Sequence, residues 1–415
     1  MIAPESLLFV VRGMILAHSF PVAIARAPVT INQDMKALEL HEPETAEYLL
    51  RALKGLKPLM LARVERSSHG TCRLDSAAYG DFPVPIPPLA EQRRIVARVD
   101  ELMALCVALE RESAGAMAAH QALAEILLAT LVNSADATDL ARDWARLERH
   151  FDTLFTTDAS IDALKQTILD LGVRGKLVEH DARDAPVKLA KNAEKETGFS
   201  FDILAALGTP LPKNWIAAPL EYLTSPMDSG WSPACHEYCS ESDDVWGVLR
   251  TTAVQNMRFE AEKNKALPSK LQPRESAETY AGDVLVTRAG PTNRVGICCF
   301  VKATRPRLMI SDKIIRFRPI SSVVDGEFLA LALSVGPAAR QMEKAKSGMA
   351  ASQVNISQSK LKAIVIPIPP LAEQHRIVAK IDALMALCDA LKDRLGDATQ
   401  TQRYLADVIT QRAAA

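Results

Sequence analysis

The chain has 415 residues and a formal net charge of −1; 48% of its residues are hydrophobic and 24% are charged. This length exceeds one ordinary core, so two or more globular domains are expected. No apolar run reaches the length of a membrane span, and the first apolar run is interrupted by Arg12 and lacks a cleavage pattern. The seven cysteines show no disulfide spacing. We therefore expect a cytoplasmic protein without membrane spans or a secretion signal.

Residues 1–88 are expected to form part of a globular domain that occurs again, more completely, at residues 211–370. LLFVVRG near Leu7 resembles DVLVTRAG near Asp283, and EYLLRALKGLK resembles EFLALALSVG. By this match Arg12 corresponds to Arg288 and Lys36 corresponds to Lys313, so both are candidate DNA contacts. The first copy starts late compared with the second, which predicts a truncated first domain or an internal start site.

An internal repeat follows each of these domains. PIPPLAEQRRIVARVDELMALCVAL starts at Pro85 and PIPPLAEQHRIVAKIDALMALCDAL starts at Pro367, so the offset is 282, and 20 of the 25 positions are identical. A period this long is too large for a solenoid unit. It indicates duplication of a whole domain together with a helix, and residues 371–415 are expected to be the second helix.

Both repeats predict a helix with a narrow apolar seam, because apolar residues recur at spacings of four and three after a proline-rich start. Such a helix could pack on its own domain, but its duplication favours packing of the two helices on each other. Cys106 and Cys388 are expected to be buried thiols in these seams. The predicted helix-packing or subunit-interface residues are Ile95, Val99, Leu102, Cys106 and Leu109 in the first copy and Ile377, Ile381, Leu384, Cys388 and Leu391 in the second.

Residues 89–178 are predicted to form a helical spacer. Leu123, Leu127 and Leu131 extend the first helix, and 133–136 offers a break with capping residues. Two further periodic stretches follow, the second of them after Ser160, and Gly172 or Gly175 ends the run. The polar residues 179–210 are predicted to be a linker.

Residues 211–370 are predicted to form a mixed α/β domain, because short β-rich runs are separated by Gly, Pro, Asn and Ser and interrupted by helical stretches. Eight lysines or arginines and one acid lie between Val286 and Arg318, while six acids and no lysine or arginine lie between Glu221 and Asp244. The basic stretch could face phosphates, or both stretches could be ordinary solvated surface. Arginine and asparagine side chains on irregular loops can pair with bases, although phosphate or structural roles are more common. The candidate DNA contacts in this domain are Arg250, Arg288, Asn293, Arg294, Ser311, Lys313, Lys346, Ser347, Gln353 and Asn355.

Catalytic motifs are missing from the sequence. It contains no Walker A string, no G-x-G-x-x-G, no methyltransferase-type Pro-Pro-aromatic string and no clear cluster of nuclease carboxylates. Cys235, His236 and Cys239 could begin a zinc site with Cys298 and Cys299, but their spacing is unusual and reduced thiols near a β core are favoured. We therefore expect no bound metal and no active site.

The duplicated IPPLAEQxRIVAxxD helices, each after a domain with a strand of the G-D-V-L-x-x-R-x-G kind, resemble the specificity subunits of type I restriction–modification systems. LKQTIL from Leu164 looks like the family's central helix, and LPKNW from Leu211 looks like the start of its second target-recognition domain. The resemblance implies an α/β (α+β) fold with two mixed α/β target-recognition domains separated by long antiparallel coiled-coil helices. It also implies partners: double-stranded DNA with a split site, two modification subunits that methylate adenine N6, and restriction subunits. S-adenosylmethionine, ATP and Mg²⁺ are then expected in those subunits, and no cofactor in this chain.

Two functions follow from this resemblance. The first is a non-catalytic specificity subunit that recognises a bipartite DNA site and scaffolds the modification and restriction subunits. The alternative is a truncated or decayed interaction subunit that binds modification subunits without full DNA recognition. A self-sufficient nuclease or methyltransferase is disfavoured, because its motifs are missing.

Overall fold

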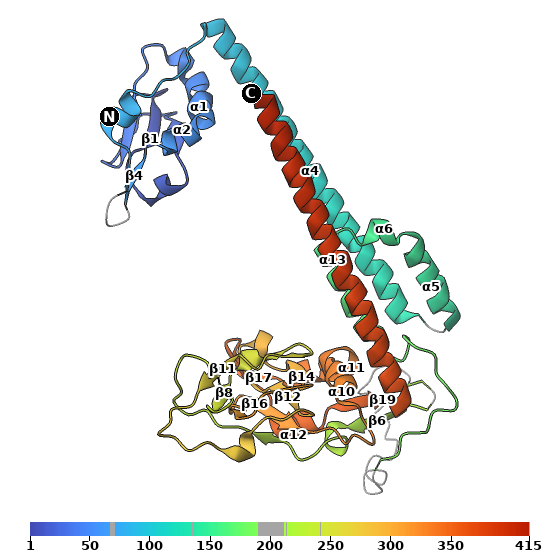
Figure 1. Cartoon of the computed structure of the whole chain (residues 1–415). Coiled ribbons are helices and arrows are strands. Elements are labelled where there is room, and N and C mark those ends of the chain that lie inside the picture. Colours follow the sequence, from blue (N-terminus) through green and yellow to red (C-terminus); the bar gives the residue numbers. More distant parts are fainter. Residues whose placement is uncertain (67–70, 135–136, 190–210, 213, 241, 415) are drawn as a thin grey trace. The chain divides into compact units, whose positions relative to one another are not determined.

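The computed structural model describes residues 1–66, 71–134, 137–189, 211–212, 214–240 and 242–414, and the statements below concern these residues. They fall into two compact units, Met1–Ala118 and Ala119–Ala415. Each unit combines helices with strands, and along the sequence the long helix α4 (Leu89–Asn133) lies between the strands of one and those of the other (Figure 1). This confirms the predicted α/β class. Most of the predicted linker, 190–210, lies outside the described residues.

The first unit contains a three-stranded antiparallel sheet in the order β2-β1-β3, in which Leu7 pairs with Ile24 on one side and with Leu38 on the other. Leu7 and Leu16 are fully buried beneath the helices, because the alternating apolar residues of β1 place one face in the core. Its elements are β1 (Leu7–Val10), β2 (Val22–Ile24), β3 (Met35–Leu38), α1 (Ala46–Gly55), α2 (Lys57–Leu61), β4 (Glu65–Arg66), β5 (Cys72–Arg73), α3 (Ser76–Gly80) and the first part of α4.

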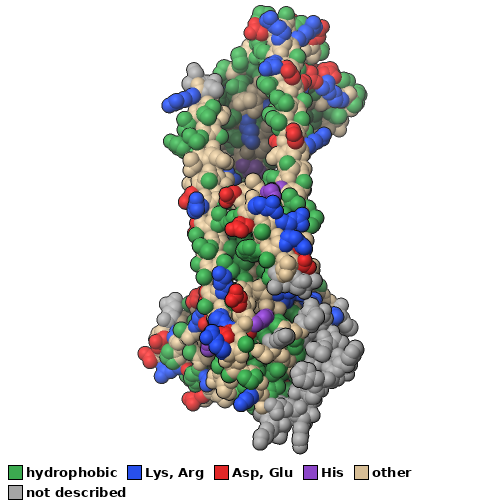
Figure 2. Space-filling view, turned by 90° about the vertical axis from the view of Figure 1, so that its right-hand side faces the viewer, with side chains coloured by type: hydrophobic (Ala, Val, Ile, Leu, Met, Phe, Trp, Pro, Cys, Tyr) green, Lys and Arg blue, Asp and Glu red, His purple; other side chains and the backbone are tan. Residues whose placement is uncertain are grey.

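Helix α4 exposes many apolar side chains, and the space-filling view shows hydrophobic side chains open on the surface of the long helices (Figure 2). Among the large ones are Leu102, Met103, Leu105, Val107, Leu109 and Met117. Cys106 is exposed too, so its predicted burial is wrong. By length and composition α4 is able to cross a membrane, which corrects the expectation that no run is long enough. One such helix is weak evidence of a membrane protein, but exposed apolar side chains in such number indicate an interaction surface.

Three helices follow α4: α5 (Ala137–Arg149), α6 (Phe151–Leu154) and α7 (Asp158–Val173). They match the predicted periodic stretches. Helix α7 begins earlier than the expected start after Ser160, because its N-cap is Thr157. The Thr157 hydroxyl accepts a hydrogen bond from the Ser160 amide, and the Ser160 hydroxyl accepts one from the Thr157 amide. Gly175, with φ of +68°, ends this helical region in the left-handed conformation that favours glycine.

The strand-rich part of the second unit is built around β12 (Val284–Thr287), whose four residues are all buried. It lies in an antiparallel sheet of order β14-β12-β16-β7. The other strands are β6 (Ile216–Pro219), β7 (Asp228–Ser229), β8 (Gly247–Leu249), β9 (Val254–Gln255), β10 (Arg258–Phe259), β11 (Asn264–Ala266), β13 (Ala289–Gly290), β14 (Cys298–Phe300), β15 (Leu308–Met309), β16 (Ile314–Phe317), β17 (Ser347–Ala350), β18 (Gln353–Asn355) and β19 (Val365–Ile368). The predicted β-rich runs therefore form strands.

Helices α10 (Gly326–Ser334) and α11 (Gly336–Ala345) lie beside this sheet at the end where α13 (Leu371–Ala414) begins (Figure 1), and the short α12 (Gln358–Lys362) precedes β19. The Asp325 carboxylate caps α10 by accepting hydrogen bonds from the amides of Glu327 and Phe328. The Gln374 side chain then joins α13 to α10, because its oxygen accepts from the Asp325 amide and its nitrogen donates to the Val323 and Pro369 carbonyls.

The first half of α13 packs antiparallel on α7. A Cβ built on Gly172 would lie 2.8 Å from Ile381 Cδ1, and at the other end Lys392 contacts Asp162 at 2.9 Å. The second-copy seam is accordingly covered, with Ile377 and Ile381 almost fully buried. Helix α7 thus covers the start of the second-copy seam, and this close approach depends on Gly172, which has no Cβ at the crossing.

Candidate nucleic-acid interface

Three chain segments meet at one edge of the second unit, and we call them the recognition edge: residues 288–294, 311–313 and 347–355. The Arg288 amide donates to the Lys313 carbonyl at 2.8 Å, and Ala289 pairs with Asn355 in the small sheet β13-β18-β17. The Thr292 amide donates to the Ala351 carbonyl at 2.8 Å. The backbone thus brings most of the predicted DNA contacts of this domain to a common place, on loops carried by a rigid sheet.

Six of the eight basic residues between Val286 and Arg318 are engaged within the domain. The Lys302 ammonium contacts Glu327 at 2.6 Å. The engaged guanidinium groups are those of Arg294, Arg305, Arg307, Arg316 and Arg318. Among the described residues, only the side chains of Arg288 and Lys313 from this set have no hydrogen-bond or ion-pair partner. Both belong to the recognition edge, so the positive charge available to a ligand is concentrated there.

The acidic stretch takes part in this neutralisation rather than facing elsewhere. Asp228 accepts a hydrogen bond from Arg316 at 2.6 Å, and Asp244 lies 3.3 Å from Arg307. The idea that the basic stretch as a whole faces phosphates is therefore wrong, because folding pairs most of it with acids and carbonyls close by in space.

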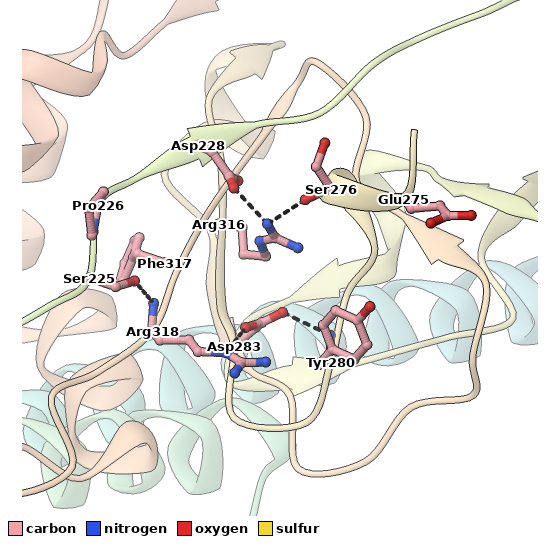
Figure 3. A pocket seen from close by; sticks show the side chains of 10 residues that line it. All are labelled: Ser225, Pro226, Asp228, Glu275, Ser276, Tyr280, Asp283, Arg316, Phe317 and Arg318. Atoms are coloured by element: carbon pink, nitrogen blue, oxygen red, sulfur yellow. Dashed lines mark hydrogen bonds and ion pairs between the residues drawn. The ribbon is translucent and has the colours of Figure 1, made fainter. Parts of the chain in front are cut away.

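Figure 3 shows one result of this pairing, a cavity of about 450 Å³ lined by charged side chains. Arg316 points to Asp228 and to the Ser276 carbonyl, while Arg318 donates to Asp283, whose side chain is 2% exposed. The Glu278 carboxylate accepts a hydrogen bond from the Tyr280 hydroxyl and raises the pKa of Tyr280. Both arginines therefore brace the strands, Arg316 through both terminal nitrogens and Arg318 through Nε.

Several predicted DNA contacts make hydrogen bonds within the domain. The Arg294 guanidinium donates to the carbonyls of Thr251 at 2.8 Å and Val254 at 2.9 Å, which fixes the 288–294 loop to β9. Arg250 donates to the Glu237 carbonyl at 2.6 Å. Arginine is suited to this work because its planar fork satisfies several carbonyls at once.

Lys346 and Ser311 also differ from expectation. The Lys346 ammonium donates to the Thr292 carbonyl at 3.0 Å and contacts Glu343, and its side chain is 10% exposed. Ser311 is 7% exposed. The Ser347 hydroxyl lies 3.4 Å from the Asn355 carbonyl and therefore helps to close the hairpin. Exposed donors remain on Asn293, Lys313, Gln353 and Asn355, with half-buried Arg288 beside them.

The first unit repeats the backbone pairing of the recognition edge, but its residues correspond to those of the second unit one position away from the match predicted from the sequence. The Val11 amide donates to the Asp34 carbonyl at 2.8 Å, as the Arg288 amide does to Lys313. Arg12 pairs with Arg73 as Ala289 pairs with Asn355. Gly13 and Gly290 then have φ of 136° and 145°. Arg12 thus occupies the place of Ala289, one residue from the predicted match with Arg288.

Lys36 is also displaced from its predicted place. It pairs with Phe9 inside β3, whereas Asp34 occupies the place of Lys313. The side chains that the hairpin of the first unit brings to the equivalent edge are Arg66 and Arg73, which the sequence analysis missed. The sequence signal that could have found them is the string Ser-Ser-His-Gly at 67–70, which precedes the proline-rich segment as Ser-Gly at 347–348 does in the second copy.

No group of three metal-ligating side chains occurs among the described residues. Burial raises the pKa of Cys299 to about 12, and it raises the pKa of Cys298 as well. His236 stacks on Tyr238 with ring centroids 4.8 Å apart. Burial therefore keeps these two thiols protonated inside the β core.

The sequence model of the type I restriction modification DNA specificity domain matches residues 5–114 and 262–397. The type I restriction enzyme EcoEI specificity subunit of Escherichia coli is 44% identical over 382 residues, which are 88% of this chain and 64% of that protein. The EcoAI specificity subunit of Escherichia coli is 31% identical over 371 residues, 83% of this chain and 60% of that protein. The chain therefore spans less than two thirds of the length of these two relatives.

Among solved structures, a chain from a study of complex assembly and conformational transition of the type I R-M system aligns with a TM-score of 0.51 and 19% identity. The alignment covers 99% of this chain and 82% of that chain. At this identity the likeness concerns the fold. It agrees with the arrangement of mixed α/β regions and long helices described above.

Proposed function

Because this chain belongs to the type I restriction–modification DNA specificity family, we propose that it supplies DNA sequence recognition to a type I complex and performs no reaction itself. The observation that carries this proposal is the recognition edge. There the side chains of Arg288 and Lys313 have no partner among the described residues, while the other six basic side chains of the stretch are hydrogen-bonded or ion-paired within the domain. Free cations beside amide side chains on loops suit simultaneous contact with phosphates and base edges.

We further propose that each unit reads half of a split site. The support is the repeated backbone pattern, in which the hairpin β4–β5 of the first unit corresponds to β17–β18 of the second. Arg288, Asn293, Lys313, Gln353 and Asn355 would contact one half-site, with Arg66 and Arg73 near the other.

The proposed partners are double-stranded DNA, modification subunits and restriction subunits. Methyl transfer, translocation and cleavage would take place in those subunits, with S-adenosylmethionine, ATP and Mg²⁺ bound there. A location in the cytoplasm, where such a complex meets DNA, remains a prediction.

The test is methylome sequencing of cells that express the chain together with modification subunits of a type I system. We expect methylated adenine within a bipartite motif, and loss of sequence preference in one half of that motif when Arg288, Asn293 and Gln353 are replaced with Ala. The matched control replaces Lys263 and Lys270, exposed residues of the same domain outside the recognition edge, with Ala.

An unchanged motif in the triple variant would remove the recognition edge from the proposal. Stable binding of modification subunits without any methylated motif would favour the alternative, an interaction subunit without full DNA recognition.

A further inference from the structure

A loop follows β1 in the first unit at the place that the 288–294 loop of the recognition edge has in the second unit. The Gly13 amide donates to the Cys72 carbonyl at 3.0 Å. In the second unit Gly290 likewise pairs with Val354. Each loop then makes one short 3-10 turn, η1 (Met14–Ala17) in the first unit and η6 (Thr292–Arg294) in the second. We call residues 13–17 the β1 loop, and it occupies the place of a loop for which base contacts are proposed.

The two turns have opposite chemistry. The sequence from residue 291 is Pro-Thr-Asn-Arg, whereas the sequence from residue 14 is Met-Ile-Leu-Ala. Hydrogen bonds from Arg294 to carbonyls anchor the polar turn, and burial of Leu16, which is 1% exposed, anchors the apolar turn in the core of the first unit. Met14 and Ile15 are left 56% and 44% exposed. Single exposed apolar side chains are common, but these two are adjacent and lie where the other unit carries polar recognition groups.

Free positive charge lies close to the β1 loop. Arg12 immediately precedes the loop, and Arg66 pairs with Cys72, whose carbonyl accepts the Gly13 amide. Both arginines are exposed, and neither side chain has a partner among the described residues. Apolar groups flanked by free cations suit a ligand that presents apolar groups between phosphates. DNA fits this description, because its base edges lie between two phosphate backbones.

The base edges of DNA leave few contacts open to such a loop. In the major groove they present hydrogen-bond donors and acceptors, and the C5-methyl group of thymine is the apolar exception. An apolar side chain placed against guanine or against the cytosine amino group removes water from polar atoms without replacing their hydrogen bonds, which weakens binding. Against the thymine methyl group the same side chain loses no hydrogen bond and buries apolar surface.

We propose that Met14 and Ile15 contact the C5-methyl group of a thymine in the half-site that the first unit reads, while Arg12 contacts a flanking phosphate. This rests on the proposed function, because it requires that the first unit reads half of a split site, and it adds the base chemistry of that half. The two units then use different chemistry at equivalent loops, apolar contact in the first and hydrogen bonds in the second.

The test uses the full chain assembled with modification subunits of a type I system and duplexes that carry the methylated motif. The half-site of the first unit is the one left unchanged by the Arg288, Asn293 and Gln353 substitutions. Each thymine of that half is replaced in turn by deoxyuridine, which lacks only the methyl group. Fluorescence anisotropy should show a loss of affinity of about fourfold for at least one of them, the value of one buried methyl group. If no thymine of that half is sensitive, the proposal is wrong.

Substitutions in the chain then locate the contact. Met14→Ser with Ile15→Ser removes the apolar groups without opening the core, so this variant should bind the thymine and deoxyuridine duplexes equally. Arg12→Ala should weaken binding to both duplexes and keep the fourfold ratio, because a phosphate contact is indifferent to the base. The control Leu59→Ser, at a 60% exposed position of α2, should change neither affinity. A fourfold ratio retained in the Met14 and Ile15 variant would show that the methyl contact is made elsewhere and would overturn the proposal.

Two further outcomes separate the alternatives. If the Met14 and Ile15 variant keeps full DNA affinity but no longer sediments with vesicles containing phosphatidylserine, the loop binds a membrane and the proposal is wrong. A bipartite motif without methyl sensitivity in either half overturns this inference alone. The absence of any bipartite motif overturns the proposed function and this inference with it.

Discussion

Removing the free cations of the recognition edge gives the sharpest test of DNA contact. The variant Arg288→Ala with Lys313→Ala deletes two positive charges that have no partner among the described residues, so folding loses no ion pair. Each charge that neutralises a DNA phosphate contributes about −0.9 to the slope of log affinity against log salt concentration, so the slope should become shallower by about 1.8.

That change in slope has a measurable size. Between 50 and 200 mM salt, a fourfold range, the advantage of the wild-type chain over the variant should shrink about twelvefold. The assay is fluorescence anisotropy with a duplex that contains the methylated motif, repeated at four salt concentrations. Lys263→Ala with Lys270→Ala removes the same charge elsewhere on the domain and should leave the slope nearly unchanged. If both double variants change the slope equally, the effect is one of overall charge and the assignment of the recognition edge fails.

Three further predictions concern packing and the thiols. Gly172→Leu should destabilise the second unit by about 1–3 kcal/mol in denaturant unfolding, because a Cβ there lies 2.8 Å from Ile381, whereas Gly115→Leu, with no atom near its Cβ, should not; equal effects would contradict close packing of α7 on α13. Glu373→Ala should lower the free energy of unfolding by about 1–3 kcal/mol, because it leaves the buried Trp215 N–H without an acceptor. The same substitution at Glu91, the exposed residue at the equivalent position of the first repeat, should change it by no more than about 0.5 kcal/mol. An unchanged stability of Glu373→Ala would disprove this role of Glu373. In the native chain at pH 8, iodoacetamide should label exposed Cys106 but not Cys298 or Cys299, as measured by mass spectrometry. Burial raises the pKa of both β-core thiols, to about 12 for Cys299, so little reactive thiolate is present there. Rapid labelling of Cys299 would refute its burial.

Local patterns predicted the elements well, because their signals lie within a few neighbouring residues. The apolar run at β12, the periodicity through α4 to α7 and the glycine stop at Gly175 were all readable from the sequence. The meeting of 288–294 with 347–355 also agrees with the expectation that both loops carry contacts.

Pairing between distant segments was not readable. Arg294 and Arg307 belong to one basic stretch in sequence, but their partners Thr251 and Asp244 are 43 and 63 positions away. Arg12 was misplaced by one residue because sequence similarity does not fix strand register, and one residue moves a side chain to the other face. The packing of α7 on the second-copy seam was not predicted, because α4 and α7 both carry suitable periodicity.

The buried amide of Gln374 has a mechanical consequence. It joins the first turn of α13 to the cap of α10 and to the carbonyl of Pro369, so the start of the long helix is tied to the strand-rich part of the unit. A rotation of α10 and the strands beside it would therefore be transmitted to α13, which is 44 residues long.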